Sequence, residues 1–158
     1  MEQELLIGIT ESGVMHTDAD PPIPLETKFQ MVKESGVYDY FDKTPPLELE
    51  DDYRRCSEKY ELPILAGGWF YVLGRDEDLL MENLRLGARL GSLVHNTQIM
   101  MDHQDGSLLS DEQVFEIYLR AYETGEACGC RPTFEVHVNM WSEAVSYTHL
   151  TLPTTYTV

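Results

Sequence analysis

Two side chains capable of acid–base and metal-binding chemistry stand two residues apart near the end of the sequence. They are Glu135 and His137, within a stretch at 133–140 that has the composition of a β-strand. Side chains two residues apart on a strand point to the same face of a sheet. Phe134 and Val136 then occupy the opposite face, so we expect a polar, chemically competent face on this strand. The simpler alternative is an edge strand with ordinary alternation of polar and apolar residues.

Two further candidates stand near the predicted ends of earlier strands. Lys43 directly follows a strand predicted at 37–42. We expect it either to hold a carboxylate or phosphate of a substrate or to pair with Asp42 or Glu48. Trp69 follows a Gly-Gly pair, and we expect it either to form the wall of a pocket or to fill the core.

Three other places carry acidic or histidine side chains. Glu11 and His16 follow the first predicted strand, and His16 lies in an acidic, proline-rich loop of the kind that often contacts ligands. For His95, in the middle of a predicted strand, a hydrogen-bonded core histidine is the preferred interpretation over a functional one. The Asp-His-Gln-Asp run at 102–105 suggests a metal cluster, but the glycine that follows it favours a solvated turn.

Several common catalytic and structural motifs are absent from the sequence. It contains no arrangement typical of a Ser-His-Asp triad and no phosphate-binding glycine loop. The three cysteines, Cys56, Cys128 and Cys130, are odd in number and include a Cys-Gly-Cys spacing. This pattern supports neither a disulfide framework nor a zinc site.

Segments typical of strands and of helices alternate along the chain without internal repeats. Strands are predicted at 5–10, 37–42, 64–72, 93–101 and 133–140. Helices are predicted over 25–35 and 48–60, between Asp76 and Gly91, and between a capping box beginning at Ser110 and Gly129.

This alternation predicts a mostly parallel sheet with right-handed crossovers. Doubly wound sheets and eight-stranded (β/α)₈ barrels both have this order of elements. No Gly-x-Gly-x-x-Gly follows the first strand, and five strands in about 140 residues match the spacing of a barrel of roughly 250 residues. We therefore predict the α/β class, as a partial and truncated (β/α)₈ TIM barrel of about five strands and four helices.

The last residues differ in composition from the rest of the chain. Residues 145–158 contain no Asp, Glu, Lys or Arg. The run from 145 to 154 corresponds, residue for residue, to one reading frame of a common transposase-based sequencing adapter. We therefore expect 1–143 to be the N-terminal part of the barrel and 144–158 to be a non-native, disordered tail.

Charge and hydropathy limit the classes of partner. Twenty-eight acidic residues against 11 basic ones give a net charge of −17, which repels nucleic-acid phosphates. No charge-free run has membrane-spanning length, and the acidic N-terminus lacks the pattern of a signal peptide. We expect no nucleic-acid partner, no membrane partner and a cytoplasmic location, while the sequence does not indicate an oligomeric state.

Several segments together resemble a known superfamily. They are Phe-Asp-Lys-Thr-Pro at 41–45, Gly-Gly-Trp-Phe at 67–70, the helix at 83–91, Val-His-Asn-Thr-Gln at 94–98 and the run at 133–143. These segments resemble the xylose isomerase-like (β/α)₈ barrels, which include sugar and sugar-phosphate isomerases, epimerases and the endonuclease IV group. The resemblance extends over residues 1–143.

The resemblance implies a divalent metal at the carboxyl ends of the strands, Mg²⁺ or Mn²⁺, with Zn²⁺ as an alternative. Glu135 corresponds to the first metal ligand of the family, whose other ligands lie on strands six to eight, which this chain lacks. The implied substrate is a carbohydrate or sugar phosphate. The catalytic candidates are Glu143 and Lys43, and the candidates for substrate contact are His137, His16 and Trp69.

The implied function is that of a metal-dependent sugar or sugar-phosphate isomerase or epimerase that moves a proton through an enediolate. The fragment itself is expected to be inactive because the remaining ligands are missing. One alternative is an endonuclease IV-like hydrolase, which the acidic charge disfavours. The other is a non-catalytic barrel that binds a small metabolite.

Overall fold

Five strands and four α-helices alternate along the chain in a computed structural model that describes residues 5–14, 22–137 and 139–141. The strands are β1 (Gly8–Thr10), β2 (Tyr40–Asp42), β3 (Ile64–Tyr71), β4 (Val94–Ile99) and β5 (Arg131–Phe134). The helices are α1 (Leu25–Ser35), α2 (Glu50–Tyr60), α3 (Glu77–Leu90) and α4 (Asp111–Cys128), with 3₁₀ turns η1 (Glu11–Gly13) and η2 (Leu47–Leu49).

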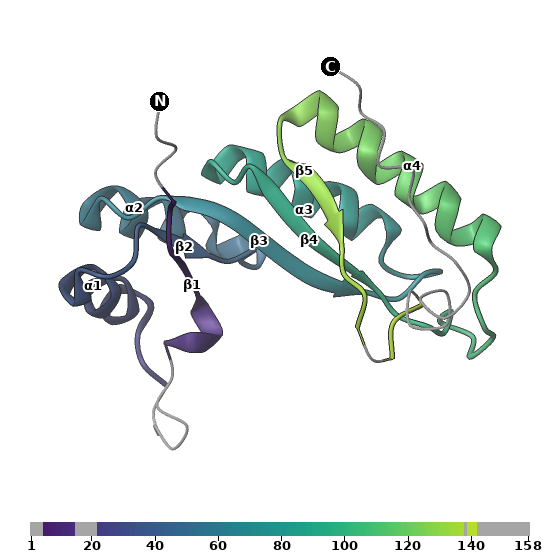
Figure 1. Ribbon diagram of the computed structural model, residues 1–158, viewed down its shortest axis with the longest axis horizontal. Coiled ribbons are helices and arrows are strands. Elements are labelled where there is room, and N and C mark those ends of the chain that lie inside the picture. Colours follow the sequence, from purple (N-terminus) through teal and green to yellow (C-terminus); the bar gives the residue numbers. More distant parts are fainter. Residues whose placement is uncertain (1–4, 15–21, 138, 142–158) are drawn as a thin grey trace.

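All strand pairs in the described sheet are parallel, and their order is β1-β2-β3-β4-β5. The helices lie along one side of this sheet (Figure 1). Neighbouring helices contact each other in sequence order, α1 with α2, α2 with α3 and α3 with α4. The predicted α/β class with five parallel strands and four helices is confirmed, and the arrangement is an arc of a (β/α) barrel.

Local sequence signals explain where the helices begin and end. Ser110 Oγ accepts a hydrogen bond from the backbone N–H of Gln113 at 3.3 Å, and the Gln113 side chain accepts one from Ser110 at 2.9 Å. The predicted capping box of α4 is therefore confirmed. Both α3 and α4 end at a glycine with positive φ, Gly91 at 98° and Gly129 at 87°, as predicted.

The core lies between the sheet and the helices. Near β1 and β2, the ring of Phe29 stacks on that of Phe41 at 4.5 Å between centroids and meets Tyr53 edge-on. A second cluster fills the space between β3, β4, α3 and α4, with Leu80, Leu84, Ile99, Val114 and Ile117 at its centre. Within the described residues, no helix is long and apolar enough to cross a membrane.

The opposite face of the sheet has no helix against it among the described residues. Side chains on this face include Phe70, which is 50% exposed, and Val94, which is 37% exposed. In a complete (β/α)₈ barrel this face would point to the interior and be packed with side chains from the other strands. We call it the open face.

The fifth strand differs from its prediction at 133–140. It begins two residues earlier and ends at Phe134, after which Glu135 donates its backbone N–H to Thr97 and the chain leaves the sheet. The first two strands are also shorter than predicted, with three residues each. Arg131 donates its backbone N–H to Leu93 of the neighbouring segment.

One residue changes the hydrogen-bonding capacity of the outer edge of β5. Backbone N–H groups of Arg131 and Glu135 point toward β4. Alternate residues of a strand direct their backbone groups to opposite sides, so Pro132 occupies a position whose N–H would point outward. Proline has no N–H, and this edge therefore lacks one of its donors.

The open face and the edges of β1 and β5 lead to the first prediction. Exposed apolar side chains and unpaired strand edges favour association between copies. We expect the chain, expressed alone, to self-associate as its concentration rises and to unfold without a sharp cooperative transition. Light scattering coupled to gel filtration, together with calorimetry, tests this. A monomer that unfolds in one cooperative step would contradict it.

Candidate functional site

A pocket of about 330 Å³ lies where the carboxyl ends of β1, β2, β3 and β4 meet. Because the strands are parallel, residues that follow each of them come together at this one edge of the sheet. The lining includes Glu11, Asp42, Lys43, Trp69, Asn96 and Gln98. Carboxylates, an ammonium group, two amides and an indole thus share one concave site.

Glu11 and Lys43 form the charged centre of this pocket. The Lys43 ammonium lies 2.8 Å from Oε2 of Glu11, and the Lys28 ammonium from α1 lies 2.6 Å from Oε1. The hydroxyl of Tyr53 donates a third hydrogen bond to Glu11 at 3.0 Å. The suggested pairing of Lys43 with Asp42 or Glu48 is therefore replaced by a pairing with Glu11.

These contacts decide the charge state of Glu11. Its side chain is only 14% exposed, and burial by itself raises the pKa of the carboxyl. Hydrogen bonds from Lys28, Lys43 and Tyr53, with the positive charge of Lys43, outweigh burial and hold the pKa below its ordinary value. Glu11 is therefore ionised at neutral pH.

Asp42, on the same wall, has a different environment. Burial raises the pKa of its carboxyl, and the charge of Lys43 offsets this only in part. The residue pairs with Thr10 of β1 and Ala66 of β3, so all three side chains share the open face. The register between β2 and β3 shifts next to Asp42, which re-aims the end of β2.

Glu135 is held from the neighbouring strand. Its Oε2 accepts hydrogen bonds from Nδ2 of Asn96 at 2.6 Å and from Nε2 of Gln98 at 2.5 Å. Asn96 and Gln98 are two residues apart on β4 and lie on the open face, where they also line the pocket. Two charge-assisted hydrogen bonds fix this carboxylate oxygen at the edge of the site.

Aromatic rings and glycines shape the third strand at the pocket. Trp69 is 47% exposed, meets Phe70 edge-on, and has the Lys43 ammonium 5.9 Å from its ring centroid. A Cβ on Gly67 would lie 2.3 Å from Oγ1 of Thr44, and one on Gly68 would lie 2.7 Å from the carbonyl oxygen of Asn96. The glycine pair therefore permits the close approach of neighbouring strands.

A buried chain of hydrogen bonds lies directly behind this wall. His95 is fully buried, with Nδ1 3.1 Å from Oγ1 of Thr44 and Nε2 2.7 Å from the Tyr71 hydroxyl. Asn83 of α3 donates to the same hydroxyl at 2.9 Å. Burial lowers the pKa of His95 to about 4, so the imidazole is neutral. The preferred interpretation of His95 as a hydrogen-bonded core residue is confirmed.

The structure brings some of the predicted site residues together and not others. Lys43 and Trp69 line the pocket, and Glu135 is joined to it through Asn96 and Gln98. His137 is exposed beyond β5, and its carbonyl oxygen accepts the backbone N–H of Met140. The predicted residues His16 and Glu143 lie outside the described residues.

Three residues of the pocket were not identified from the sequence as candidate site residues. Asp42 was considered only as a partner of Lys43. Asn96 and Gln98 appeared only as members of the Val-His-Asn-Thr-Gln run at 94–98. Their alternation along β4 is the same signal that marked Glu135 and His137, so the pattern was available on this strand too.

The side chains near Glu135 do not by themselves make a metal site. In the part of the chain that the structure describes, no three His, Cys, Asp or Glu side chains gather closely enough to hold an ion. The described donors to Glu135 are amide nitrogens, and Glu11 is bonded by two lysines. Hard divalent ions need several oxygen ligands, and the described residues around Glu135 do not supply such a set.

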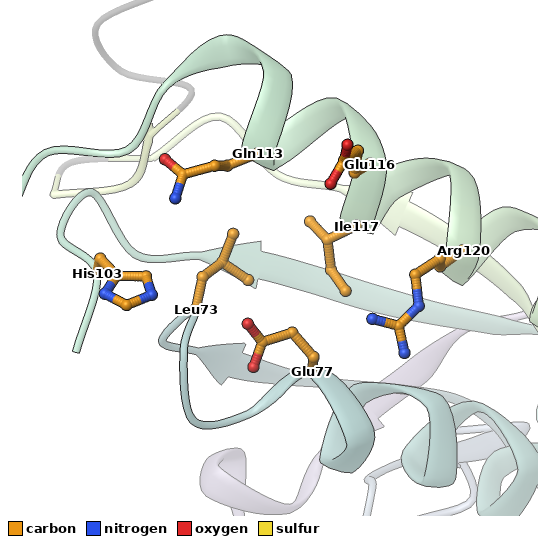
Figure 2. A pocket seen from close by; sticks show the side chains of 7 residues that line it. All are labelled: Leu73, Glu77, His103, Gln113, Glu116, Ile117 and Arg120. Atoms are coloured by element: carbon orange, nitrogen blue, oxygen red, sulfur yellow. The ribbon is translucent and has the colours of Figure 1, made fainter.

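A second pocket, of about 210 Å³, lies in the helix layer between α3 and α4. Figure 2 shows Leu73 and Ile117 facing each other across it, with Glu77, Glu116 and Arg120 around one end and His103 and Gln113 around the other. At the 102–105 segment, Ser107 donates from its backbone and its hydroxyl to Oδ1 of Asp105, which makes a turn. The turn interpretation of this segment is therefore confirmed.

No protein-family model matches the sequence, and no curated protein does. Several solved structures resemble its fold. A sugar phosphate isomerase/epimerase from Parabacteroides distasonis ATCC 8503 gives a TM-score of 0.54 at 11% identity, over 81% of this chain and 50% of that one. A 3-dehydroquinate dehydratase from Geobacillus kaustophilus HTA426 gives 0.52 at 20% identity, over 82% of this chain and 49% of that one. The chain thus has a partial TIM-barrel fold and spans about half the length of these proteins.

Likeness at these identities shows the fold alone, and the two proteins catalyse different reactions. The expected barrel architecture is supported by both. The choice among functions has to rest on the chemistry of the pocket.

The neutral, buried His95 gives a prediction about stability and pH. Its pKa is about 4 in the folded chain and 6.5 in the unfolded chain, so the unfolded state binds the proton first as pH falls. The contribution of His95 to the free energy of unfolding is therefore complete above pH 6.5, and about 3 kcal/mol of it is lost as the pH falls from 6.5 to 4. Urea unfolding across this range should show a weaker pH dependence in His95→Gln. Equal slopes in both proteins would contradict this.

The hydroxyl of Tyr53 gives a prediction about the charged centre. Removing it in Tyr53→Phe takes one donor from Glu11, which should lower the free energy of unfolding by about 1 kcal/mol and raise the pKa of Glu11. Tyr60→Phe is the matched control, because it removes a hydroxyl from the same helix that contacts the exposed Glu26. Urea unfolding and carboxyl-carbon NMR measure the two effects. Equal losses in both variants would contradict the assignment.

Proposed function

We propose that this pocket binds a sugar or sugar phosphate and that the complete protein is an isomerase or epimerase that moves a proton between neighbouring carbons. One observation carries the proposal. The Glu135 carboxylate is fixed by two amides on the open face, beside a pocket that also contains the ion pair of Lys43 with Glu11. Fixed polar groups within a concave site are what a polyhydroxylated ligand requires.

Each kind of group in the pocket matches a part of such a ligand. Amides and carboxylates hydrogen-bond to hydroxyl groups, and Asn96, Gln98 and Asp42 supply them. The exposed rings of Trp69 and Phe70 offer apolar surface to the C–H faces of a carbohydrate. The Lys43 ammonium, 26% exposed, is placed to pair with a phosphate or with negative charge on an oxygen.

The divalent metal implied by the resemblance remains part of the proposal for the complete protein. Such an ion would polarise the oxygens of the substrate. Glu135 is the residue proposed to hold it, and the other ligands must come from beyond the described residues. Glu143, His16 and His137 keep their proposed catalytic and substrate-contacting roles in that complete protein. This chain alone is proposed to bind ligand without turnover.

The position of the two tryptophans makes binding measurable. The chain contains only Trp69 and Trp141, so Trp141→Phe leaves Trp69 as the single indole. We expect D-ribulose 5-phosphate and D-ribulose to change its emission in a saturable way. Lys43→Met should weaken binding of the phosphorylated sugar about tenfold and that of the free sugar much less, because one charged contact is removed.

Lys33→Met is the matched control for this measurement. Lys33 is an exposed lysine of α1 that lies 3.9 Å from Glu61, away from the pocket. Its substitution removes the same charge and should leave both affinities unchanged. An emission that does not respond to either sugar would contradict the proposed function.

A further inference from the structure

Asp42 is a pocket carboxylate to which neither the fold nor the resemblance assigns a role. It ends β2, and its pairing with Thr10 and Ala66 directs its side chain to the open face. It lines the 330 Å³ pocket together with Lys43. Among the described residues, no hydrogen-bond donor reaches its carboxylate, and burial is the main influence on its charge.

The pocket therefore contains two carboxylates in opposite environments. Glu11 accepts three hydrogen bonds, two of them from lysines, and remains ionised. The pKa of Asp42 is raised by burial, which the charge of Lys43 only partly offsets. Two titratable groups whose environments separate their pKa values in one site commonly divide acid–base roles between them.

The surroundings of Asp42 leave few other influences on its proton. The charged residue next to Asp42 in the chain is Lys43. The charged residue at the end of β1 is Glu11, whose negative charge is neutralised by its ion pairs with Lys28 and Lys43. The facing part of β3 is Ala66, Gly67 and Gly68, which carry no charge. Asp42 is thus a carboxyl group at the pocket wall whose pKa is raised mainly by burial, and it stands where a bound molecule could exchange a proton with it.

We propose that Asp42 is the group that carries the proton in this pocket, acting on a hydroxy-ketone or hydroxy-aldehyde. This inference rests on the proposed function. The Asp42 carboxylate takes the proton from the carbon next to the carbonyl group. The electron pair of the broken C–H bond forms a C=C bond, and the carbonyl electron pair moves onto oxygen, giving an enediolate. The hydroxyl proton on the first carbon's oxygen then passes to the former carbonyl oxygen, and Asp42 returns its proton to the former carbonyl carbon. The C=C electron pair forms the new C–H bond and the O–H electron pair forms the new C=O bond, so no other reactant is needed.

The position of Lys43 supports this step. Its ammonium stands at the pocket wall next to Asp42 and is held by Glu11 at 2.8 Å. Negative charge that develops on the ligand oxygen would find this fixed cation nearby, and a preorganised charge stabilises such an intermediate. Asp42, protonated at that stage, donates a hydrogen bond to the planar enediolate and only then gives up its proton.

Binding of an enediolate analogue tests the inference without requiring turnover. The probes are D-ribulose 5-phosphate and 4-phospho-D-erythronohydroxamate, a planar analogue of its enediolate, with a chelator present to remove metal. Affinities are read from Trp69 emission in the Trp141→Phe background. The wild-type pocket should bind the hydroxamate at least about tenfold more tightly than the ketose, because transition-state analogues exceed substrates in affinity.

Three variants separate a proton-carrying role from a structural one. Asp42→Asn should abolish the preference for the hydroxamate, because the affinity for the hydroxamate should fall at least about tenfold further than the affinity for the ketose. Asp42→Glu, which keeps a carboxyl group, should recover part of the preference. Asp51→Asn is the control, because Asp51 is 93% exposed on α2 and its substitution should change neither affinity.

The outcomes distinguish this inference from the proposed function. If neither probe binds the wild-type chain, the proposed function is wrong and the role of Asp42 fails with it. If the ketose binds and the hydroxamate binds no more tightly, the function stands and the role of Asp42 is wrong. A preference that survives in Asp42→Asn likewise overturns the role of Asp42 alone.

Discussion

A fully buried histidine that must satisfy both ring nitrogens constrains the centre of this fold. The imidazole of His95 can stay in the core only while Thr44 and Tyr71 remain hydrogen-bonded to it, because an unpaired polar group there costs about 1–3 kcal/mol. These partners stand on β3 and directly after β2, and Asn83 extends the chain of bonds to α3. The end of β2 is thereby fixed, and with it the position of Lys43.

The two faces of the sheet carry different kinds of side chain. Side chains of one parity, such as His95, Thr97 and Ile99 on β4, are buried against the helices and stabilise the arc. Side chains of the other parity, such as Asn96 and Gln98, carry the polar groups of the pocket. Because the strands are parallel, the polar residues near their carboxyl ends all lie at the same edge of the sheet.

Helices and their order were predictable from sequence because their signals are local. The capping box at Ser110 and the glycine stops of α3 and α4 lie within a few residues of the boundaries they determine. The end of β5 was not predictable in this way, since alternation of polar and apolar residues continues to 140 although the hydrogen bonds to β4 end with that of Glu135.

In the candidate site too, only the features that depend on local sequence could be predicted. Glu135 and Lys43 were recognisable from residue type and position. The pairing of Lys43 with Glu11 joins residues 32 positions apart, and the burial of Asp42 depends on three strands at once, so no local pattern reveals either.

Pro132, which removes one backbone donor from the outer edge of β5, also affects how copies of the chain can associate. Extension of β5 by an incoming strand would lack one rung of its ladder, and the net charge of −17 repels each added copy. Ordered fibril growth is thus hindered at this edge even though the sheet is open.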